Sequence, residues 1–219
     1  MSGPNAGPAP RLPVIGLTGA PGSGKSEAAR LLAERGGAVV DADRLAREAA
    51  GEPEVVEAAV RWWGEAVRNP AGGLDRAEVA RRVFRDPEQR RRLEGLIHPR
   101  VAQRRAALHA EASRGGAARF VVEDCPLLLE AGLDAGCDEV WLVEAPREAR
   151  LLRVAARGWD AAELDRREAA QASPERRRER ADRRLDNGGT PEGLERAVAA
   201  ALDAFLRAHP AADAAPRTG

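Results

Sequence analysis

Residues 19–26 read Gly19-Ala20-Pro21-Gly22-Ser23-Gly24-Lys25-Ser26, and this stretch decides the fold of the 219-residue chain. It fits the pattern G-x-x-x-x-G-K-[ST], in which backbone N–H groups surround phosphates, the lysine reaches the terminal phosphates and the hydroxyl holds Mg²⁺. Lys25 is the only lysine in the chain, against 34 arginines. Its compact ammonium can enter between phosphate oxygens where a planar guanidinium would crowd them. The stretch therefore predicts a nucleotide-binding loop.

The segments on either side of this loop follow in the order that a phosphate-binding loop requires. Residues 14–18 (VIGLT) form a short apolar run that predicts a buried strand. Residues 26–35 (SEAARLLAER) carry apolar side chains at helical spacing and end at Gly36-Gly37, a typical helix stop. The positive end of the helix dipole then faces the phosphates. This context favours a nucleoside-triphosphate-dependent phosphotransferase.

Three further apolar runs predict strands at 38–40, 120–124 and 139–143, and a short fifth strand is expected at 184–186. Because helical stretches separate these runs, they predict an α/β fold with a parallel sheet covered on both faces. Ligands of such sheets bind beyond the carboxyl ends of the strands. The loops after the first four strands should therefore border one cleft, with two helical insertions as its walls. In the first insertion we expect His98-Pro99 to interrupt the helical structure.

Composition excludes several classes of protein. The 35 basic and 35 acidic side chains cancel, so no overall basic field would attract nucleic acid. No apolar run approaches the roughly 18 residues of a membrane span. Cys125 and Cys137 form no CxxC pair, so we expect small buried thiols in a reducing cytosol rather than a metal site. We expect a cytoplasmic monomer or weak homo-oligomer without nucleic-acid or membrane partners.

The loop supplies most of the candidate ATP ligands. Glycine allows the backbone to approach a phosphate closely, and Lys25 is also a candidate catalytic residue because its charge can stabilise the transferred group. Ser26 is the expected Mg²⁺ ligand, and an N-cap of the following helix is its alternative role. The residues predicted to bind ATP here are Gly19, Ala20, Pro21, Gly22, Ser23, Gly24, Lys25, Ser26 and Glu27.

Carboxylates follow two of the predicted strands. Asp41 and Asp43 come after the second strand, where a carboxylate could orient or deprotonate the hydroxyl that accepts a phosphoryl group. Asp43 is our candidate for that role, and capping the helix that begins near residue 44 is the alternative. Asp124 ends the third strand and could help hold hydrated magnesium. Its neighbour Glu123 has the opposite strand parity, so only one of the two can face the phosphates.

Arginines recur at spacings of three and four along one predicted helix face, at Arg147, Arg150, Arg153 and Arg157. A solvated, salt-bridged helix is the common explanation of such a pattern. The alternative is a mobile helix whose charge stabilises a transition state and whose closure excludes water, with Arg157 as a candidate catalytic residue. The run at 175–180 favours a solvated face. For His98, packing or capping is favoured over catalysis.

Several motifs follow the phosphate loop in a fixed order: Val40-Asp41-Ala42-Asp43 with Leu45-Ala46-Arg47, Leu74-Asp75-Arg76, Val83-Phe84, Ile97-His98-Pro99, Pro126-Leu127-Leu128-Leu129-Glu130-Ala131-Gly132-Leu133, Ala169-Ala170-Gln171-Ala172-Ser173, and Ala181-Asp182 leading to Leu185-Asp186-Asn187-Gly188-Gly189. With these motifs the chain resembles the dephospho-coenzyme A kinases. The phosphate loop alone fits many kinases, whereas an ordered set of motifs between residues 14 and 206 is far more specific. Two residues depart from the family's usual pattern: Ala20, tolerable if its φ is negative, and Glu27, which we expect to point away from the phosphates.

The resemblance implies ATP- and Mg²⁺-dependent phosphorylation of the ribose 3′-hydroxyl of dephospho-coenzyme A, giving coenzyme A. It also implies a P-loop NTPase-type three-layer α/β/α fold with a parallel five-stranded sheet, a helical substrate-binding insertion and a helical lid. We accordingly expect one kinase domain over 13–207, between flexible tails at 1–12 and 208–219. Its expected parts are a core at 13–43, 117–146 and 183–207, a coenzyme A-binding insertion at 44–116 and a lid at 147–182.

By the same resemblance, Asp43 matches the proposed base and contacts the substrate, and Arg157 belongs to the lid. Further expected substrate-binding residues are Arg47, His98, Pro126 and Leu127, while Asn187 and Gly188 fall where adenine is held. The nearest rival function is another small-molecule or nucleoside-monophosphate kinase. A GTP-binding switch would need an N-K-x-D box, which a chain with Lys25 as its only lysine cannot contain.

Overall fold

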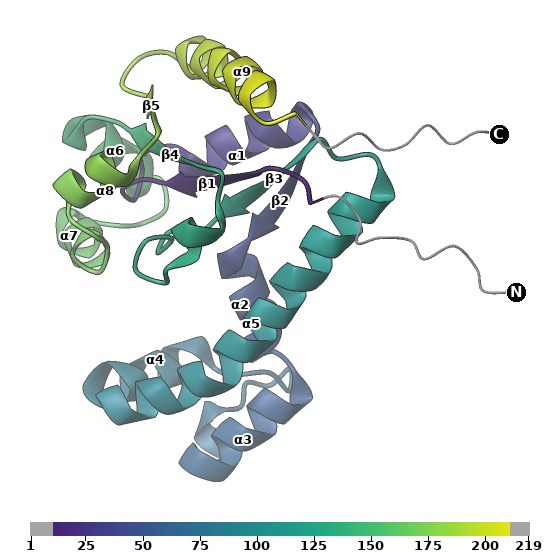
Figure 1. The fold of residues 1–219 in the computed structure, drawn as a ribbon. Coiled ribbons are helices and arrows are strands. Elements are labelled where there is room, and N and C mark those ends of the chain that lie inside the picture. Colours follow the sequence, from purple (N-terminus) through teal and green to yellow (C-terminus); the bar gives the residue numbers. More distant parts are fainter. Residues whose placement is uncertain (1–10, 211–219) are drawn as a thin grey trace, which may run out of the picture. The chain divides into compact units, whose positions relative to one another are not determined.

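A computed structural model describes residues 11–210, so the expected tails lie almost entirely outside the described residues. One sheet of five parallel strands has the order β2-β3-β1-β4-β5 (Figure 1). Each expected strand is confirmed to within one residue at either end, and the α/β fold is confirmed with them. The strands are β1 (Val14–Thr18), β2 (Gly37–Asp41), β3 (Phe120–Asp124), β4 (Glu139–Glu144) and β5 (Arg183–Asp186).

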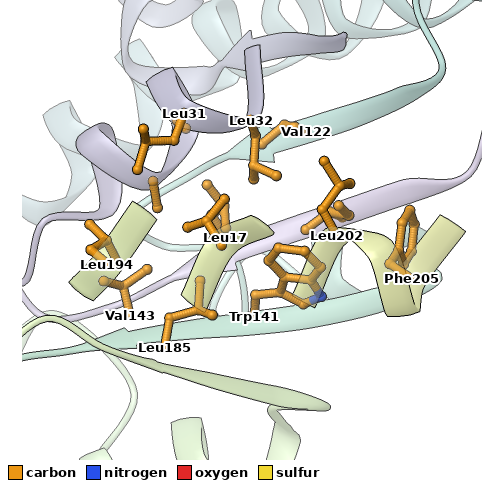
Figure 2. Close-up of a cluster of buried hydrophobic side chains, with 14 of the residues drawn as sticks. Leu17, Leu31, Leu32, Val122, Trp141, Val143, Leu185, Leu194, Leu202 and Phe205 are labelled. Carbon is orange, nitrogen blue, oxygen red and sulfur yellow. The ribbon is translucent and has the colours of Figure 1, made fainter. Parts of the chain in front are cut away.

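The main apolar core lies between the sheet and two helices, α1 (Lys25–Glu34) and α9 (Pro191–Ala208) (Figures 1 and 2). Leu17 and Trp141 project from adjacent strands, and Phe205 of α9 packs edge-on against Trp141 with ring centroids 6.0 Å apart. All three side chains are buried. Truncating a buried aromatic to alanine typically costs about 3–5 kcal/mol. This core therefore fixes α1, and with it the phosphate loop, at the carboxyl end of β1.

The described chain divides into two compact units, of which the first contains the sheet and the second is residues 42–108. Besides α1 and α9, the sheet unit contains a 3-10 turn, η2 (Leu133–Gly136), and three helices in the expected lid segment. Those helices are α6 (Arg147–Ala155), α7 (Ala161–Ala169) and α8 (Pro174–Arg180). Side chains cap two of them: Asp160 accepts from the Glu163 amide at 2.8 Å, and Ser173 from the Arg176 amide at 3.2 Å.

The second unit consists mainly of helices. It contains α2 (Ala42–Ala50), α3 (Pro53–Trp63), the 3-10 turn η1 (Glu65–Val67), α4 (Arg76–Arg85) and α5 (Pro87–Gly115) up to residue 108. Ion pairs join α5 to the turn between α2 and α3: Arg100 and Arg104 both bind the Glu52 carboxylate, at 2.8 and 2.7 Å. Among residues 11–210, no helix has both the length and the apolarity to cross a membrane.

The expected interruption at His98-Pro99 is wrong, because α5 continues through both residues. Proline lacks an N–H and its ring crowds the carbonyl four residues earlier. Here that earlier residue is Gly95, which is exposed and has no side chain, so water can hydrate its freed carbonyl. The helix therefore tolerates Pro99.

The two cysteines differ in burial, and neither forms a disulfide with a residue that the structure describes. Cys125 is buried as expected, whereas Cys137 is only half-buried, which corrects the expectation for that residue. The Cys137 sulfur packs so closely on β1 that a Cβ on Gly16 would lie 2.7 Å from it. Cys137 therefore requires glycine at position 16 in the strand that leads into the phosphate loop.

Candidate active site

The phosphate loop presents unused backbone donors. Gly22 and Gly24 adopt positive φ angles of 79° and 98°, which turn the chain tightly before α1. Inside the loop the Ser23 amide donates to the Ala20 carbonyl at 3.0 Å. Among the described residues, none accepts from four other amides, those of Gly22, Gly24, Lys25 and Ser26. Free N–H groups at a helix N-terminus form a binding site for an anion.

Lys25 forms an ion pair with Asp124, the last residue of β3. Strand parity separates the two neighbouring carboxylates, as expected. Glu123 is 1% exposed and its Oε1 lies 2.5 Å from Nε2 of His109, whereas Asp124 reaches the phosphate loop. Asp124 also has Asp41 as its Cα partner across the β2–β3 pair. The acidic residue beside the loop is therefore Asp124, and its role toward metal stays a prediction.

Ser26 is exposed in the first turn of α1 and is not the helix N-cap, which is Gly24. The capping alternative for Ser26 is therefore wrong. Glu27 binds Arg30 along the helix surface at 2.6 and 3.0 Å, and this hydrogen bonding holds the pKa of Glu27 below its usual value. Its charge is thus directed to Arg30, as expected. Ser23 is buried, and its hydroxyl has no partner among residues 11–210.

The carbonyl side of the loop is held by two side chains. Arg153 of α6 donates to the carbonyls of Gly22 and Ser23 at 3.2 and 3.3 Å, and to that of Asn187 at 2.8 Å. The buried Asn187 amide also donates to the Ser23 carbonyl, at 2.8 Å. Because these carbonyls are occupied, the peptide planes of the loop are fixed. The motif did not single out Arg153 for this role; its position in the arginine series was the only signal.

The arginine series does not share one environment. Arg147 binds Asp165 on the surface at 2.6 Å, as the salt-bridged alternative predicts. Arg150 is buried and binds Glu168 at 3.0 Å. Arg157 lies beyond the end of α6, is exposed, and makes no side-chain hydrogen bond or ion pair with the described residues. The arginine that contacts the loop is therefore Arg153, and the role of Arg157 stays a prediction.

The solvated face predicted for 175–180 is wrong at Arg177, which is only 4% exposed. Its guanidinium donates to the Gln171 side-chain oxygen at 2.7 Å and lies 3.4 Å from the Glu168 carboxylate. Gln171 in turn donates to the carbonyls of Gly19 and Pro126, at 3.2 and 2.8 Å. Neither contact was predicted, although Gln171 stands in one of the sequence motifs.

Residues expected at the substrate occupy several elements. Asp43 is exposed and lies inside the first turn of α2, which begins at Ala42, so it is not that helix's N-cap. Arg47 is exposed one helical turn later. His98 is exposed in the middle of α5, so the packing and capping roles favoured for it are wrong. Leu127, after β3, is also exposed.

Two remaining predicted residues lie on the loops of the sheet unit. Pro126, whose carbonyl accepts from Gln171, is half-buried directly after β3 and Cys125. Gly188 follows Asn187 after β5, is exposed, and donates its amide to the Asp186 carboxylate at 2.8 Å. A side chain at Gly188 would approach Pro146 Cδ at 2.9 Å, so this turn is closely packed against the end of β4.

Comparison with known proteins matches residues 13–192 of the chain to the family model of dephospho-CoA kinase. The dephospho-CoA kinase of Deinococcus radiodurans is 47% identical over 200 residues, covering 89% of this chain and 95% of that protein. That of Rhodopirellula baltica is 37% identical over 206 residues, covering 91% and 94%.

Two solved structures are similar to the chain as well. The crystal structure of TT1252 from Thermus thermophilus has a TM-score of 0.75 at 42% identity, over 89% of this chain and 98% of that one. Dephospho-CoA kinase from Campylobacter jejuni has a TM-score of 0.62 at 18% identity, over 88% and 96%, and supports the fold.

Proposed function

The chain belongs to the dephospho-CoA kinase family, and we propose how its residues divide the work of that reaction. The enzyme transfers a phosphoryl group from ATP to the ribose 3′-hydroxyl of dephospho-CoA, giving coenzyme A. The observation that best supports our assignment of roles is the set of four free amides beside the Lys25–Asp124 pair. The phosphate loop would bind the triphosphate of ATP through those amides.

Lys25 would exchange its bond with Asp124 for the terminal phosphates when ATP binds. Its charge then stabilises the negative charge that spreads over the oxygens of the transferred group. The residues present fit Mg²⁺, because the exposed Ser26 hydroxyl and the Asp124 carboxylate are hard oxygen donors. When bound, Mg²⁺ would neutralise charge on the phosphates. No cluster of three metal-binding side chains exists among the described residues, which suits an ion that is held largely by phosphates and water.

Asp43 would accept or orient the proton of the 3′-hydroxyl. It lies two residues beyond Asp41, the last residue of β2, and ligands of parallel sheets bind at these strand ends. Arg47 and His98 would bind the substrate within the helical unit, for which their exposure leaves both side chains available. Pro126 and Leu127 would contact it from the segment after β3.

Arg157 would contribute a further positive charge once ATP is bound, since its side chain has no other partner among residues 11–210. Asn187 and Gly188 would border the adenine. We place the reaction in the cytoplasm, in keeping with Cys125 and Cys137, which form no disulfide with a described residue; a reducing compartment keeps thiols in this state.

The test is a comparison of acceptors at one concentration of ATP and Mg²⁺. ADP release is measured with dephospho-CoA, shikimate, gluconate and a nucleoside monophosphate in parallel, because the nearest rival is another small-molecule kinase. We expect turnover with dephospho-CoA to exceed every other acceptor by at least about 100-fold in kcat/KM, or roughly 3 kcal/mol of transition-state binding. Faster turnover of any other acceptor would refute the proposed function.

A further inference from the structure

We propose that Gln171 is a positioning residue that sets the spacing between the phosphate loop and the segment 125–132 after β3. One side chain touches both. Nε2 of Gln171 donates to the Gly19 carbonyl at 3.2 Å and to the Pro126 carbonyl at 2.8 Å. A primary amide carries two hydrogens, so each carbonyl can receive one. The inference rests on the proposed function in one respect, the contact of 126–127 with the acceptor.

The orientation of the Gln171 amide is determined by its neighbour. Arg177 donates to Oε1 of Gln171 at 2.7 Å. A guanidinium has donors and no acceptor, so only the oxygen of the amide can face it. Flipping the amide would direct its N–H groups at the guanidinium and its oxygen at two carbonyls. Nε2 must therefore face Gly19 and Pro126.

Arg177 is itself fixed by a buried charged network. It is 4% exposed and lies 3.4 Å from Oε1 of Glu168, whose other oxygen binds Arg150 at 3.0 Å. Arg150 is 8% exposed. Buried guanidinium groups require partners, so two arginines that share one carboxylate have little freedom to move. The network joins α6, α7 and α8 into a rigid support for Gln171.

The residue after Gln171 is attached to the same segment. The Ala172 amide donates to the carboxylate of Glu130, the glutamate of the P-L-L-x-E motif. Residues 171–172 therefore hold the segment 125–132 at two points, the Pro126 carbonyl and the Glu130 side chain. Of residues 171 and 172, only Gln171 also hydrogen-bonds the phosphate loop within the described part of the chain, at Gly19. Loss of this side chain would remove one hydrogen bond between the phosphate loop and this segment, while the segment remains held at Glu130.

The two ends that Gln171 joins are those that carry the chemistry. Gly19 begins the loop that contains Lys25, and Pro126 lies two residues after Asp124, the partner of Lys25. Phosphoryl transfer depends on alignment of donor and acceptor, and an error of about 1 Å can cost roughly 100-fold in rate. The consequence is a residue that affects the transfer step while contacting neither substrate.

The experiment replaces Gln171 with glutamate, which has the same shape but no hydrogen to donate when ionised. In Gln171→Glu, we expect kcat to fall about 100-fold, with KM for ATP and for dephospho-CoA each within about threefold of wild type. Asp203→Asn is the control for an isosteric change of one charge, because Asp203 is exposed on α9, outside the proposed site, and has no side-chain partner among the described residues. That variant should retain the kcat of the wild type.

A kcat unchanged in Gln171→Glu, or a loss confined to KM, would overturn the proposal. If this variant does not fold, the neutral Gln171→Met variant is measured in the same way. Failure of both variants to fold would show that Gln171 is purely structural and would also overturn the proposal. The proposed function is judged separately, on the wild-type enzyme. A wild type that does not phosphorylate dephospho-CoA would refute that function, whereas an active wild type with an equally active Gln171→Glu would refute only the inference.

Discussion

Helix α1 lies between two glycines with left-handed backbone. Replacing each of them by alanine and comparing the two variants isolates the energetic effect of one contact of the phosphate loop. Gly24, the N-cap, has φ +98°, and Gly36, just past the C-terminus, has φ +90°. Alanine at either position costs about 1–2 kcal/mol in left-handed strain. At Gly36 the added Cβ would lie 3.4 Å from Arg119 Cδ, an ordinary contact, whereas at Gly24 it would lie 2.0 Å from Nδ2 of Asn187.

Asn187 must therefore move in Gly24→Ala. Its 2.8 Å hydrogen bond to the Ser23 carbonyl would break, and a buried polar group left without a partner costs about 1–3 kcal/mol. We expect Gly24→Ala to lose about 2–5 kcal/mol in the free energy of unfolding, against about 1–2 kcal/mol for Gly36→Ala. Because Asn187 helps fix the loop, the Kd for magnesium-ATP should rise at least about tenfold in Gly24→Ala only, or about 1.4 kcal/mol.

Denaturant unfolding gives the two free energies, and calorimetric titration with magnesium-ATP gives the two dissociation constants. Gly36→Ala serves as the control for strain without contact. Equal losses of stability in the two variants would refute the reasoning, since the contact with Asn187 would then have no energetic consequence. An unaltered ATP affinity in Gly24→Ala would refute the role of Asn187 in holding the loop.

Three further predictions concern other parts of the molecule. Asp43→Asn should lower kcat about 100- to 10,000-fold with little change in either KM, as steady-state kinetics would detect; an effect on KM alone contradicts the role of base. Arg153→Met loses hydrogen bonds from a charged donor to the loop, each worth about 1.5–3 kcal/mol, so the Kd for ATP measured by calorimetry should rise at least about tenfold. In the control, Arg207→Met, the replaced side chain is exposed on α9 and the Kd should equal that of the wild type. Burial raises the pKa of Glu139, but hydrogen bonds from Arg183 and Trp141 outweigh burial and lower the pKa below 4.5. The free energy of unfolding should therefore fall as pH drops below 4.5, and it should fall less in the Glu139→Gln variant. An equal pH dependence in the two proteins would contradict this.

The strands could be predicted from sequence because buried parallel strands are nearly continuous apolar runs. Residues 14–18 and 120–124 are buried throughout in the structure; the first run ends at the glycine-rich loop and the second at Cys125-Pro126. The phosphate loop and the opposite orientations of the Glu123 and Asp124 side chains could be predicted too, because both follow from local rules of sequence spacing. Pro99 was misjudged because the tolerance of α5 depends on the exposed Gly95 four residues earlier, a detail that the general rule against proline omits.

The contacts behind the phosphate loop could not be predicted, because each depends on a partner from a distant segment. Arg153 and Arg157 share one helical spacing, and only the end of α6 at Ala155 removes Arg157 from the face that meets the loop. Arg177 stands in a polar run typical of a solvated helix, and it is buried because Glu168 and Gln171 offer it partners. Tertiary packing determines the burial and the partners of these arginines, and the local sequence contains little information about either.

The most direct test of the central claim identifies the product. Wild-type enzyme is mixed with ATP, Mg²⁺ and dephospho-CoA, and the reaction is followed by ³¹P NMR. We predict one new phosphomonoester resonance, coupled to the ribose H3′ proton, that grows at the rate at which ADP appears. ADP released without that resonance, or a phosphate attached at any other hydroxyl, would contradict the claim that this loop delivers the terminal phosphate of ATP to the 3′-hydroxyl.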